Sequence, residues 1–470
     1  MLQNRLLFDL DYDLTMEKTS KTNIFIISLW LVISCITMIN HELWRDETQV
    51  WCIVRDLGLI DIFKMARVEG HPLLWYLLVL PFAKLGLPVI SMQIVSLLLV
   101  FSSVVYFTLR SPFTTWFKVL FLFSAGMMYD MSIVARNYCI IPLAIFLLAG
   151  FYSERFKHPY IYSILIILLS QTHALMLGLS GILALIFIIE ILKEKKNFIP
   201  ISLVVVNFVS LFFYFLNTTN ENMAVVGYDK LPLINFLSEF STLFFLPLNI
   251  IPLVASVALY IVLVILFYTL FKQNKKLCLI TFVGIAFIFY VLGSIWFGGI
   301  LYQKAFVLYF PIIWAYWVLQ KEYNLEFKPL KIAIYTFCIF SLIRTPFCLL
   351  QDISLNFSGS EQIAEYINRE LADEKEFILV GDAFFTSPIS AYLKDKKIYS
   401  YNIKKYSTFY FFNEKTEPIE IPSNVKYYII QEDYAVDEKL GYKKIFATDS
   451  QNLSTAKQRE VFTIYLKEGI

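Results

Sequence analysis

The chain has 470 residues, of which 58% are hydrophobic, and its mean hydropathy is +0.63. Only 17% are charged, against about 25% in soluble proteins, and 40 Lys and Arg nearly balance 38 Asp and Glu. This composition excludes an ordinary soluble protein and gives no sign of a nucleic-acid partner, so we expect an integral membrane protein.

The first apolar stretch, residues 23–40, is too long for the core of a signal peptide and lacks a clear cleavage site. Lys18 and Lys21 precede it. Because basic residues stay on the cytoplasmic side, we expect a retained signal anchor with residues 1–22 in the cytoplasm. The compartment that we expect is the plasma (inner) membrane.

Further apolar stretches have the 17 to 25 residues that cross about 30 Å of hydrocarbon. They lie at 89–109, 114–129, 137–152, 159–175, 176–192, 198–216, 249–271, 277–297, 304–320 and 331–350. With the anchor, they predict an α-helical polytopic domain of about eleven spans over residues 23–350.

The stretch 71–87 carries Pro81 and can be either a span or an interfacial helix. The positive-inside rule decides, because one added span moves every later loop to the other side. Without that span, the basic loops all lie in the cytoplasm: Arg110/Lys118, Arg155/Lys157, Lys193/Lys195/Lys196, Lys272/Lys275/Lys276 and Lys321/Lys328/Lys331. We therefore predict a long outer loop at 41–88, with 129–137, 171–175, 217–248 and 298–304 on the same face.

The composition turns polar after the last span, and residues 355–470 are predicted to form a small extracytoplasmic α/β domain. "SGSEQIAEYINREL", with Ser360 as N-cap, and "SPISAYLKD" have helical patterns, whereas "EFILVGD" and "VKYYII" are typical of buried strands.

The outer loop opens with "HELWRDETQVW", residues 41–51. Trp44 and Trp51 are expected at the level of the lipid headgroups, around the acidic residues Asp46 and Glu47. Two interpretations are open. The acidic pair is either the solvated start of a juxtamembrane helix or a general base that serves an acceptor hydroxyl.

Such a base needs a partner site for an anionic leaving group carried by a lipid. Arg136, in "YDMSIVARNY", either binds phosphate in a polar cavity or extends to the headgroups, and Lys304, in "GGILYQKAF", has the same alternatives. His71 and His173 either line a polar pocket or bond to backbone carbonyls at helix ends. The full set of candidate ligand-binding residues is Arg136, Lys304, His71, Asp130, His173, Gln171 and Tyr302.

These features resemble a known family. A multispanning chain with "WRDETQVW" after the first span, then "GHPLLWYLL", then "ARNY" at the head of a later span, is similar to the GT-C superfamily of membrane glycosyltransferases. The nearest subgroup contains protein O-mannosyltransferases and aminoarabinose lipid A transferases, and the tail resembles that of an uncharacterised bacterial branch. The likeness covers roughly the first 190 residues, and the family's two-proline motif is reduced here to His71-Pro72.

The resemblance implies a GT-C fold and an inverting transfer of a hexose or pentose from a polyprenyl-phosphate donor. The family's acidic residue corresponds to Asp46, with Glu47 beside it, and the phosphate-binding residue to Arg136, with Lys304 as a looser match. The implied partners are the lipid-linked donor, a glycan, lipid or protein acceptor in the cell envelope, and membrane lipids. No cofactor or metal site is assigned, although a divalent metal is compatible with this chemistry.

Two rival classes remain open. A transporter or flippase would carry ionisable residues at mid-membrane on broken helices of two related halves, whereas here the charges gather in outer loops. A non-enzymatic protein that binds lipid-linked sugars would share the pocket and lack turnover.

Overall fold

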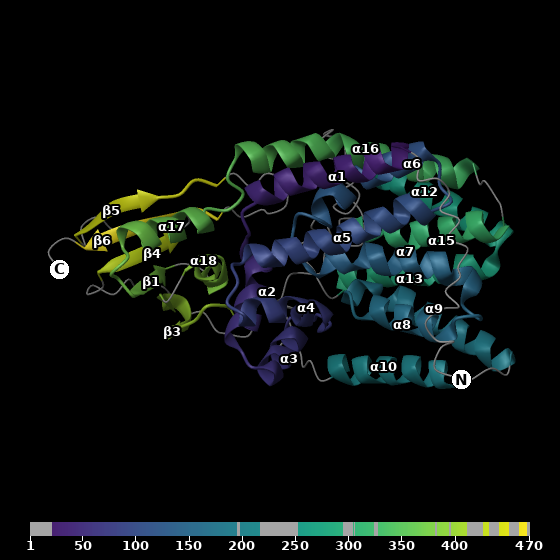
Figure 1. Cartoon of the computed structure of the whole chain (residues 1–470), viewed down its shortest axis with the longest axis horizontal. Helices are drawn as coiled ribbons and strands as arrows, with labels where there is room; N and C mark the ends of the chain where they lie inside the picture. The colour runs from purple at the N-terminus through teal and green to yellow at the C-terminus, as the bar shows by residue number, and fades with distance from the viewer. Residues whose placement is uncertain are drawn as a thin grey trace.

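The structure is a computed structural model that describes residues 21–194, 198–216, 252–294, 304, 306–323, 328–380, 383–393, 396–410, 426–431, 441–450 and 460–467. A bundle of long helices carries, at one of its ends, a domain built on a six-stranded sheet (Figure 1). The predicted helical part and the predicted α/β tail are thus both present. The outer loop 217–248, the loop 298–303 with Tyr302, and most of the N-terminal segment lie outside the described residues.

Seven helices of the described part are long and apolar enough to cross a membrane. Their cores are α1 (Lys21–Asn40), α5 (Ile90–Arg110), α7 (Ile141–Phe151), α9 (Leu177–Lys193), α10 (Ile199–Leu216), α13 (Lys275–Ser294) and α16 (Lys328–Ser354). Three further apolar helices run with them: α8 (Pro159–Ser170), α12 (Pro252–Gln273) and α15 (Tyr309–Tyr323). The predicted span 114–129 is not one continuous helix, because α6 (Thr115–Leu122) ends early and a π-helical turn, η1 (Gly126–Asp130), follows it.

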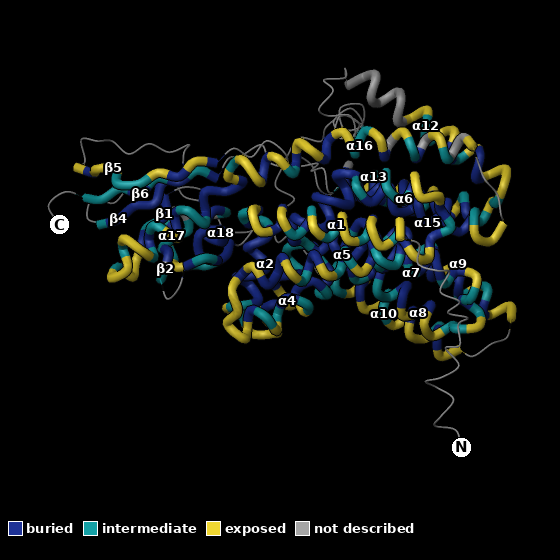
Figure 2. The backbone as a smooth tube through the Cα atoms, turned by 45° about the horizontal axis from the view of Figure 1, so that its top comes forward, coloured by how far each residue is buried: buried dark blue, intermediate teal, exposed yellow. Residues whose placement is uncertain are grey.

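The outside of the bundle is apolar. Figure 2 shows buried residues along its middle and exposed ones along its outer faces. The exposed side chains include large hydrophobic ones such as Phe212, Phe213, Tyr260, Phe271 and Phe282. Contiguous apolar surface of this kind is rare on soluble proteins, and it fits contact with lipid chains. The chain is a multi-pass membrane protein.

Three short helices connect α1 to α5: α2 (Arg45–Asp56), α3 (Leu59–Val68) and α4 (Leu74–Lys84). With 11 residues, α4 reaches only about 16 Å at 1.5 Å per residue, roughly half the hydrocarbon thickness. This length agrees with an outer loop that does not cross. Gly70, with φ of +72°, reverses the chain between α3 and α4, a conformation that side chains with a Cβ rarely adopt.

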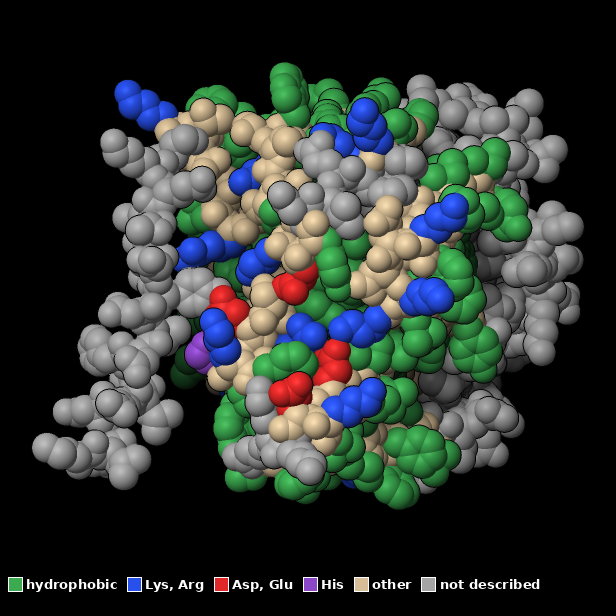
Figure 3. All heavy atoms as spheres, turned by 90° about the vertical axis from the view of Figure 1, so that its right-hand side faces the viewer, with side chains coloured by type: hydrophobic (Ala, Val, Ile, Leu, Met, Phe, Trp, Pro, Cys, Tyr) green, Lys and Arg blue, Asp and Glu red, His purple; other side chains and the backbone are tan. Residues whose placement is uncertain are grey.

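The end of the bundle away from the tail carries many basic side chains (Figure 3). Side-chain contacts join the predicted cytoplasmic loops here: Lys276 and Arg155 both bind Glu190, at 2.6 and 3.0 Å, and Lys321 donates to the Gly150 carbonyl at 2.6 Å. Loops that were predicted to share one side of the membrane therefore meet.

The tail sheet has the strand order β3-β2-β1-β4-β6-β5. The strands are β1 (Glu376–Val380), β2 (Lys397–Ser400), β3 (Lys405–Tyr406), β4 (Tyr427–Gln431), β5 (Tyr442–Ala447) and β6 (Phe462–Lys467). The central β1 runs parallel to β2 and β4, and the other pairings are antiparallel. The helices α17 (Ser360–Glu370) and α18 (Thr386–Tyr392) contribute Ile363, Ile367 and Ile389 to the core that they share with Phe377 and Ile429 of the sheet.

The predicted strands and helices of the tail are confirmed, but the predicted N-cap is wrong. The cap of α17 is Gly359, and Ser360 is the first helical residue. The Ser360 hydroxyl instead lies 2.6 Å from that of Ser358 and 3.4 Å from the Glu460 carboxylate.

Candidate functional site

A pocket lies where the outer loop, the turn before α7 and the tail meet. Its volume is about 470 Å³, including space open to solvent. The lining residues are Asp46, Gln49, Val50, Glu69, His71, Trp75, Tyr76, Arg136, Asn137 and Tyr410.

The geometry of helix α2 directs the side chains of Asp46 and Glu47 to different sides of the helix. Successive residues of an α-helix point about 100° apart, whereas positions three and four apart share a face. Asp46, Gln49 and Val50 therefore line the pocket together, and Glu47 points elsewhere. Both carboxylates lie in the first turn of α2, where negative charge stabilises a helix.

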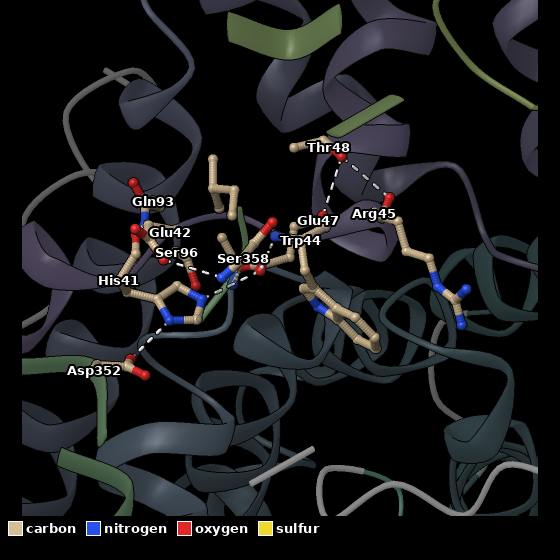
Figure 4. Close-up of polar contacts among 12 residues, drawn as sticks. His41, Glu42, Trp44, Arg45, Glu47, Thr48, Gln93, Ser96, Asp352 and Ser358 are labelled. Carbon is tan, nitrogen blue, oxygen red and sulfur yellow. Dashed lines mark hydrogen bonds and ion pairs between the residues drawn. The ribbon is translucent and has the colours of Figure 1, made fainter. Parts of the chain in front are cut away.

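Glu47 is fully buried and does not line the pocket (Figure 4). Its Oε1 accepts from the backbone N–H of Ala135 at 2.6 Å, and its Oε2 accepts from the backbone N–H of Trp44 at 3.2 Å. The Nε2 atom of His41 lies 3.2 Å from the same Oε2. Glu47 thus holds α2 against the turn that carries Arg136, and Asp46 is the member of the pair that faces the pocket.

His41 bridges two buried carboxylates (Figure 4). Its Nδ1 lies 2.7 Å from Asp352 Oδ2 and its Nε2 faces Glu47, while the Tyr129 hydroxyl donates to Asp352 Oδ1 at 2.8 Å. Burial lowers the pKa of His41, but the charges of Asp352 and Glu47 outweigh it and raise that pKa to about 10. A protonated His41 therefore ties the end of α1 to α2 and α16.

Asp46 and Arg136 form an ion pair across the pocket. Arg136 Nη1 lies 3.0 Å from Asp46 Oδ2, although no aligned hydrogen bond is present. The Arg136 side chain is 12% exposed and that of Asp46 is 23% exposed. Burial opposes the guanidinium charge, and Asp46 more than compensates, so that the pKa of Arg136 is raised. The site therefore holds a charged arginine that a ligand can reach.

A second basic side chain, Lys304, lies near the Arg136 of the pocket lining, which also holds the acidic residues Asp46 and Glu69. Burial and the charge of Arg136 lower the pKa of Lys304 to about 8, which leaves it mostly protonated at pH 7. The same two causes lower the pKa of His71 to about 3, and burial together with the neighbouring His71 lowers the pKa of His173 well below its usual value. Both histidines are thus neutral, with ring centres 5.3 Å apart, and His173 stacks on Tyr138 at 4.3 Å. A negatively charged ligand is favoured here.

Hydrogen bonds along one side of the pocket connect α2 to the tail. Gln49 Nε2 donates to Glu69 Oε1 and to the Tyr410 carbonyl, both at 2.8 Å, and Gln49 Oε1 accepts from the Tyr410 N–H at 3.1 Å. The Tyr76 hydroxyl donates to the second Glu69 oxygen. Burial raises the pKa of Glu69 to about 7.

Besides Arg136 Nη1, two buried donors of the pocket lining have no hydrogen-bond acceptor among the described residues: Asn137 Nδ2 and Trp75 Nε1. Asn137 is 4% exposed and Trp75 is 1% exposed. A buried polar group without a partner costs about 1–3 kcal/mol. Oxygen atoms of a bound ligand would satisfy both donors.

Several residues predicted for the site lie elsewhere. Asp130 is buried and accepts two hydrogen bonds from Arg344 of α16, at 2.7 and 2.8 Å, and Gln171 donates to Asn207 of α10 at 2.9 Å. Trp44 and Trp51 were expected at the headgroups, but they are 3% and 2% exposed and packed inside the protein. The expectation failed because the tail covers this part of the outer loop.

Six polar or aromatic lining residues were not predicted from the sequence, and several of them had local signals. Gln49 is three residues after Asp46, Glu69 directly precedes the Gly-His-Pro motif, and Asn137 follows Arg136. Trp75 and Tyr76 lie within the apolar stretch after that motif. The sixth missed residue, Tyr410, gave no signal, because its place in the pocket depends on how the tail docks.

The described residues contain no group of three or more His, Cys, Asp or Glu side chains that could hold a metal ion. No protein-family model matches the chain, and no curated protein matches it significantly. The geometry of the pocket is therefore the basis on which a function is proposed.

Proposed function

We propose that the protein is an inverting glycosyltransferase that moves a sugar from a polyprenyl-phosphate donor to an acceptor on the outer face of the membrane. The observation that carries this proposal is the Asp46–Arg136 pair, at 3.0 Å, in a pocket at the tail end of a membrane-spanning bundle. The gathering of basic loops at the opposite end supports the outer location of the pocket.

In this mechanism, binding of the donor breaks the ion pair between Asp46 and Arg136, and each side chain then interacts with a substrate. The phosphate of the donor binds Arg136, with Lys304 adding positive charge, and so frees the Asp46 carboxylate. The acceptor O–H then attacks the anomeric carbon, its proton passes to Asp46, and the bond from that carbon to the phosphate oxygen breaks. The electron pair leaves with the phosphate, whose charge the two cations stabilise. Asn137 supplies a further donor to phosphate or sugar oxygens.

The proposal is tested by purifying the protein with its native lipids and identifying co-purifying polyprenyl-phosphate sugars by mass spectrometry. We expect such a lipid with the wild type and at least about a tenfold loss of it in Arg136→Ala, because Arg136 is the main phosphate contact. Lys64→Ala is the matched control, since Lys64 is an exposed cation of the loop that carries Asp46 and does not line the pocket.

Absence of any such lipid from the wild type, or equal amounts in Arg136→Ala, contradicts the proposal. A binding protein without turnover would retain the lipid and depend on Arg136 in the same way. The Asp46 variant described in the Discussion separates that class from an enzyme.

A further inference from the structure

The tail lies beside α2 (Figure 1), and hydrogen bonds join it to α2 and to the residues just before that helix. The backbone N–H of Arg45 donates to Glu460 Oε1 at 3.0 Å, and Arg55 Nη1 donates to the Ser390 carbonyl at 2.9 Å. Before α2, the N–H of Leu43 donates to the Tyr392 hydroxyl at 3.0 Å. The contacts span α2 from its first residue to its last turn, so the tail and the helix that carries Asp46 have one fixed arrangement.

Gln49 makes the contact nearest to the pocket. Its amide oxygen accepts from the Tyr410 N–H, and its amide nitrogen donates to the Tyr410 carbonyl, as a neighbouring strand would. The second N–H of the same amide group is taken by Glu69. This amide thus fixes Tyr410, which is 4% exposed, as part of the pocket lining.

The types of residue that line the pocket suggest which part of the donor Tyr410 contacts. On the proposed function, the phosphate occupies the Arg136 side of the pocket, and the sugar is the group next to it. Besides Arg136, Asp46, His71 and Asn137, the polar and aromatic lining is Gln49, Glu69, Trp75, Tyr76 and Tyr410. Planar polar groups and aromatic faces in this combination suit a hydroxylated ring, which has many hydrogen-bonding groups and apolar C–H edges.

We propose that the C-terminal domain is part of the substrate site, and that its Tyr410, positioned by Gln49, selects the hydroxylated ring attached to the lipid phosphate. This inference rests on the proposed function and deepens it. In this proposal the tail helps to select the substrate, and it is more than a domain that the membrane helices display at the cell surface.

The test compares two classes of lipid in nanodiscs. One is undecaprenyl phosphate without a sugar, and the other is a panel of undecaprenyl phosphates that carry mannose, glucose, galactose or arabinose. We expect the wild type to bind at least one panel member at least about tenfold more tightly than the bare lipid, equivalent to about 1.4 kcal/mol. Tyr410→Ala should lose this preference and bind the bare lipid as the wild type does.

Tyr406→Ala is the matched control, because Tyr406 is a tyrosine of the same domain that is 50% exposed and does not line the pocket. It should keep the preference. Unchanged binding of the bare lipid shows that a variant is folded. If Tyr410→Ala does not purify as a monodisperse protein, Tyr410→Leu, which keeps most of the side-chain bulk, carries the same test.

The outcomes separate the two proposals. A wild type that binds neither class of lipid contradicts the proposed function. A wild type that binds the bare lipid without preferring any panel member, or a Tyr410→Ala protein that keeps the preference, overturns the role of Tyr410 and leaves the proposed function standing. Arg136→Ala should weaken binding of both classes, which distinguishes a phosphate contact from a sugar contact.

Discussion

The carboxylate of Asp46 and the guanidinium of Arg136 come from different loops between the membrane helices and lie 3.0 Å apart in one pocket. Glu47 cannot take the place of Asp46 without breaking its own contacts to Ala135 and Trp44. The proposed chemistry therefore depends on one carboxylate, and this gives the most direct mutational test.

We expect Asp46→Asn to lower sugar transfer by about 100-fold or more, the usual contribution of a general base, because the amide keeps the shape and cannot take the proton. The measurement is transfer of labelled sugar by purified protein in nanodiscs. Asp61→Asn, at an exposed carboxylate of α3, should retain wild-type activity. Full activity of Asp46→Asn would show that Asp46 is not the base.

The pH dependence of transfer should contain a step that belongs to Glu69. Burial raises the pKa of Glu69 to about 7, so this carboxyl is neutral below pH 7 and ionised above it. Only the ionised form accepts with both oxygens, from Gln49 and from Tyr76. We expect initial rates to rise as the pH passes about 7, and Glu69→Gln to remove that rise.

Two other carboxyls need to be separated from Glu69 in this experiment. Burial also raises the pKa of Glu42 and that of Glu460 to about 7, and both lie in the interface between the outer loop and the tail. Glu42→Gln and Glu460→Gln should keep the rise near pH 7. If the rise survives in Glu69→Gln, it originates elsewhere.

His41 should contribute stability that depends on pH. Removing one partner of a buried charged pair costs about 3–5 kcal/mol, so we expect His41→Gln to lower the Tm clearly. The folded-state pKa of about 10 lies above the ordinary value of 6.5. The contribution is therefore complete below pH 6.5, declines above it, and is lost as the pH passes 10.

Thermal unfolding of the purified protein between pH 6 and pH 10 measures this effect. The gap in Tm between wild type and His41→Gln should narrow as the pH rises. His158→Gln serves as the control, because the His158 side chain is 36% exposed. A constant gap over the whole pH range would mean that His41 is not protonated in the folded protein.

The orientation of the chain can be tested with single cysteines. Lys64 lies exposed in the outer loop, and Lys275 lies exposed in a predicted cytoplasmic loop. A membrane-impermeant maleimide should label Lys64→Cys in intact cells and Lys275→Cys only after permeabilisation, relative to the unmodified chain. The opposite labelling pattern would invert the membrane arrangement and place the pocket in the cytoplasm.

The sequence predicts the long helices well, because an apolar stretch in lipid must satisfy its backbone hydrogen bonds internally. Helices α5 and α9 match their predicted ranges to within one or two residues. The stretch 114–129 fails because hydropathy does not reveal where a helix breaks, and here α6 gives way to a π-helical turn that ends at Asp130.

The candidate site was predicted in part for the same physical reasons. The composition of the loops and their order along the chain predicted that Asp46, Arg136 and His71 lie on one face of the membrane. All three line the pocket. The local sequence pattern could not show that the Glu47 side chain points into the protein. Glu47 contacts His41, and His41 is itself held by Asp352 of a helix distant in sequence. In the same way, the Arg344 partner of Asp130 lies within a predicted span.

The contact between Gln49 and Tyr410 joins residues 361 positions apart. A ribosome adds about 5 to 20 residues per second. Tyr410 is therefore synthesised on the order of tens of seconds after Gln49 of α2. The seven long apolar helices of the described residues are made before Tyr410. If Tyr410 has the proposed role, the nascent protein gains sugar selectivity only when the sheet domain folds, after these helices and Asp46 have been synthesised.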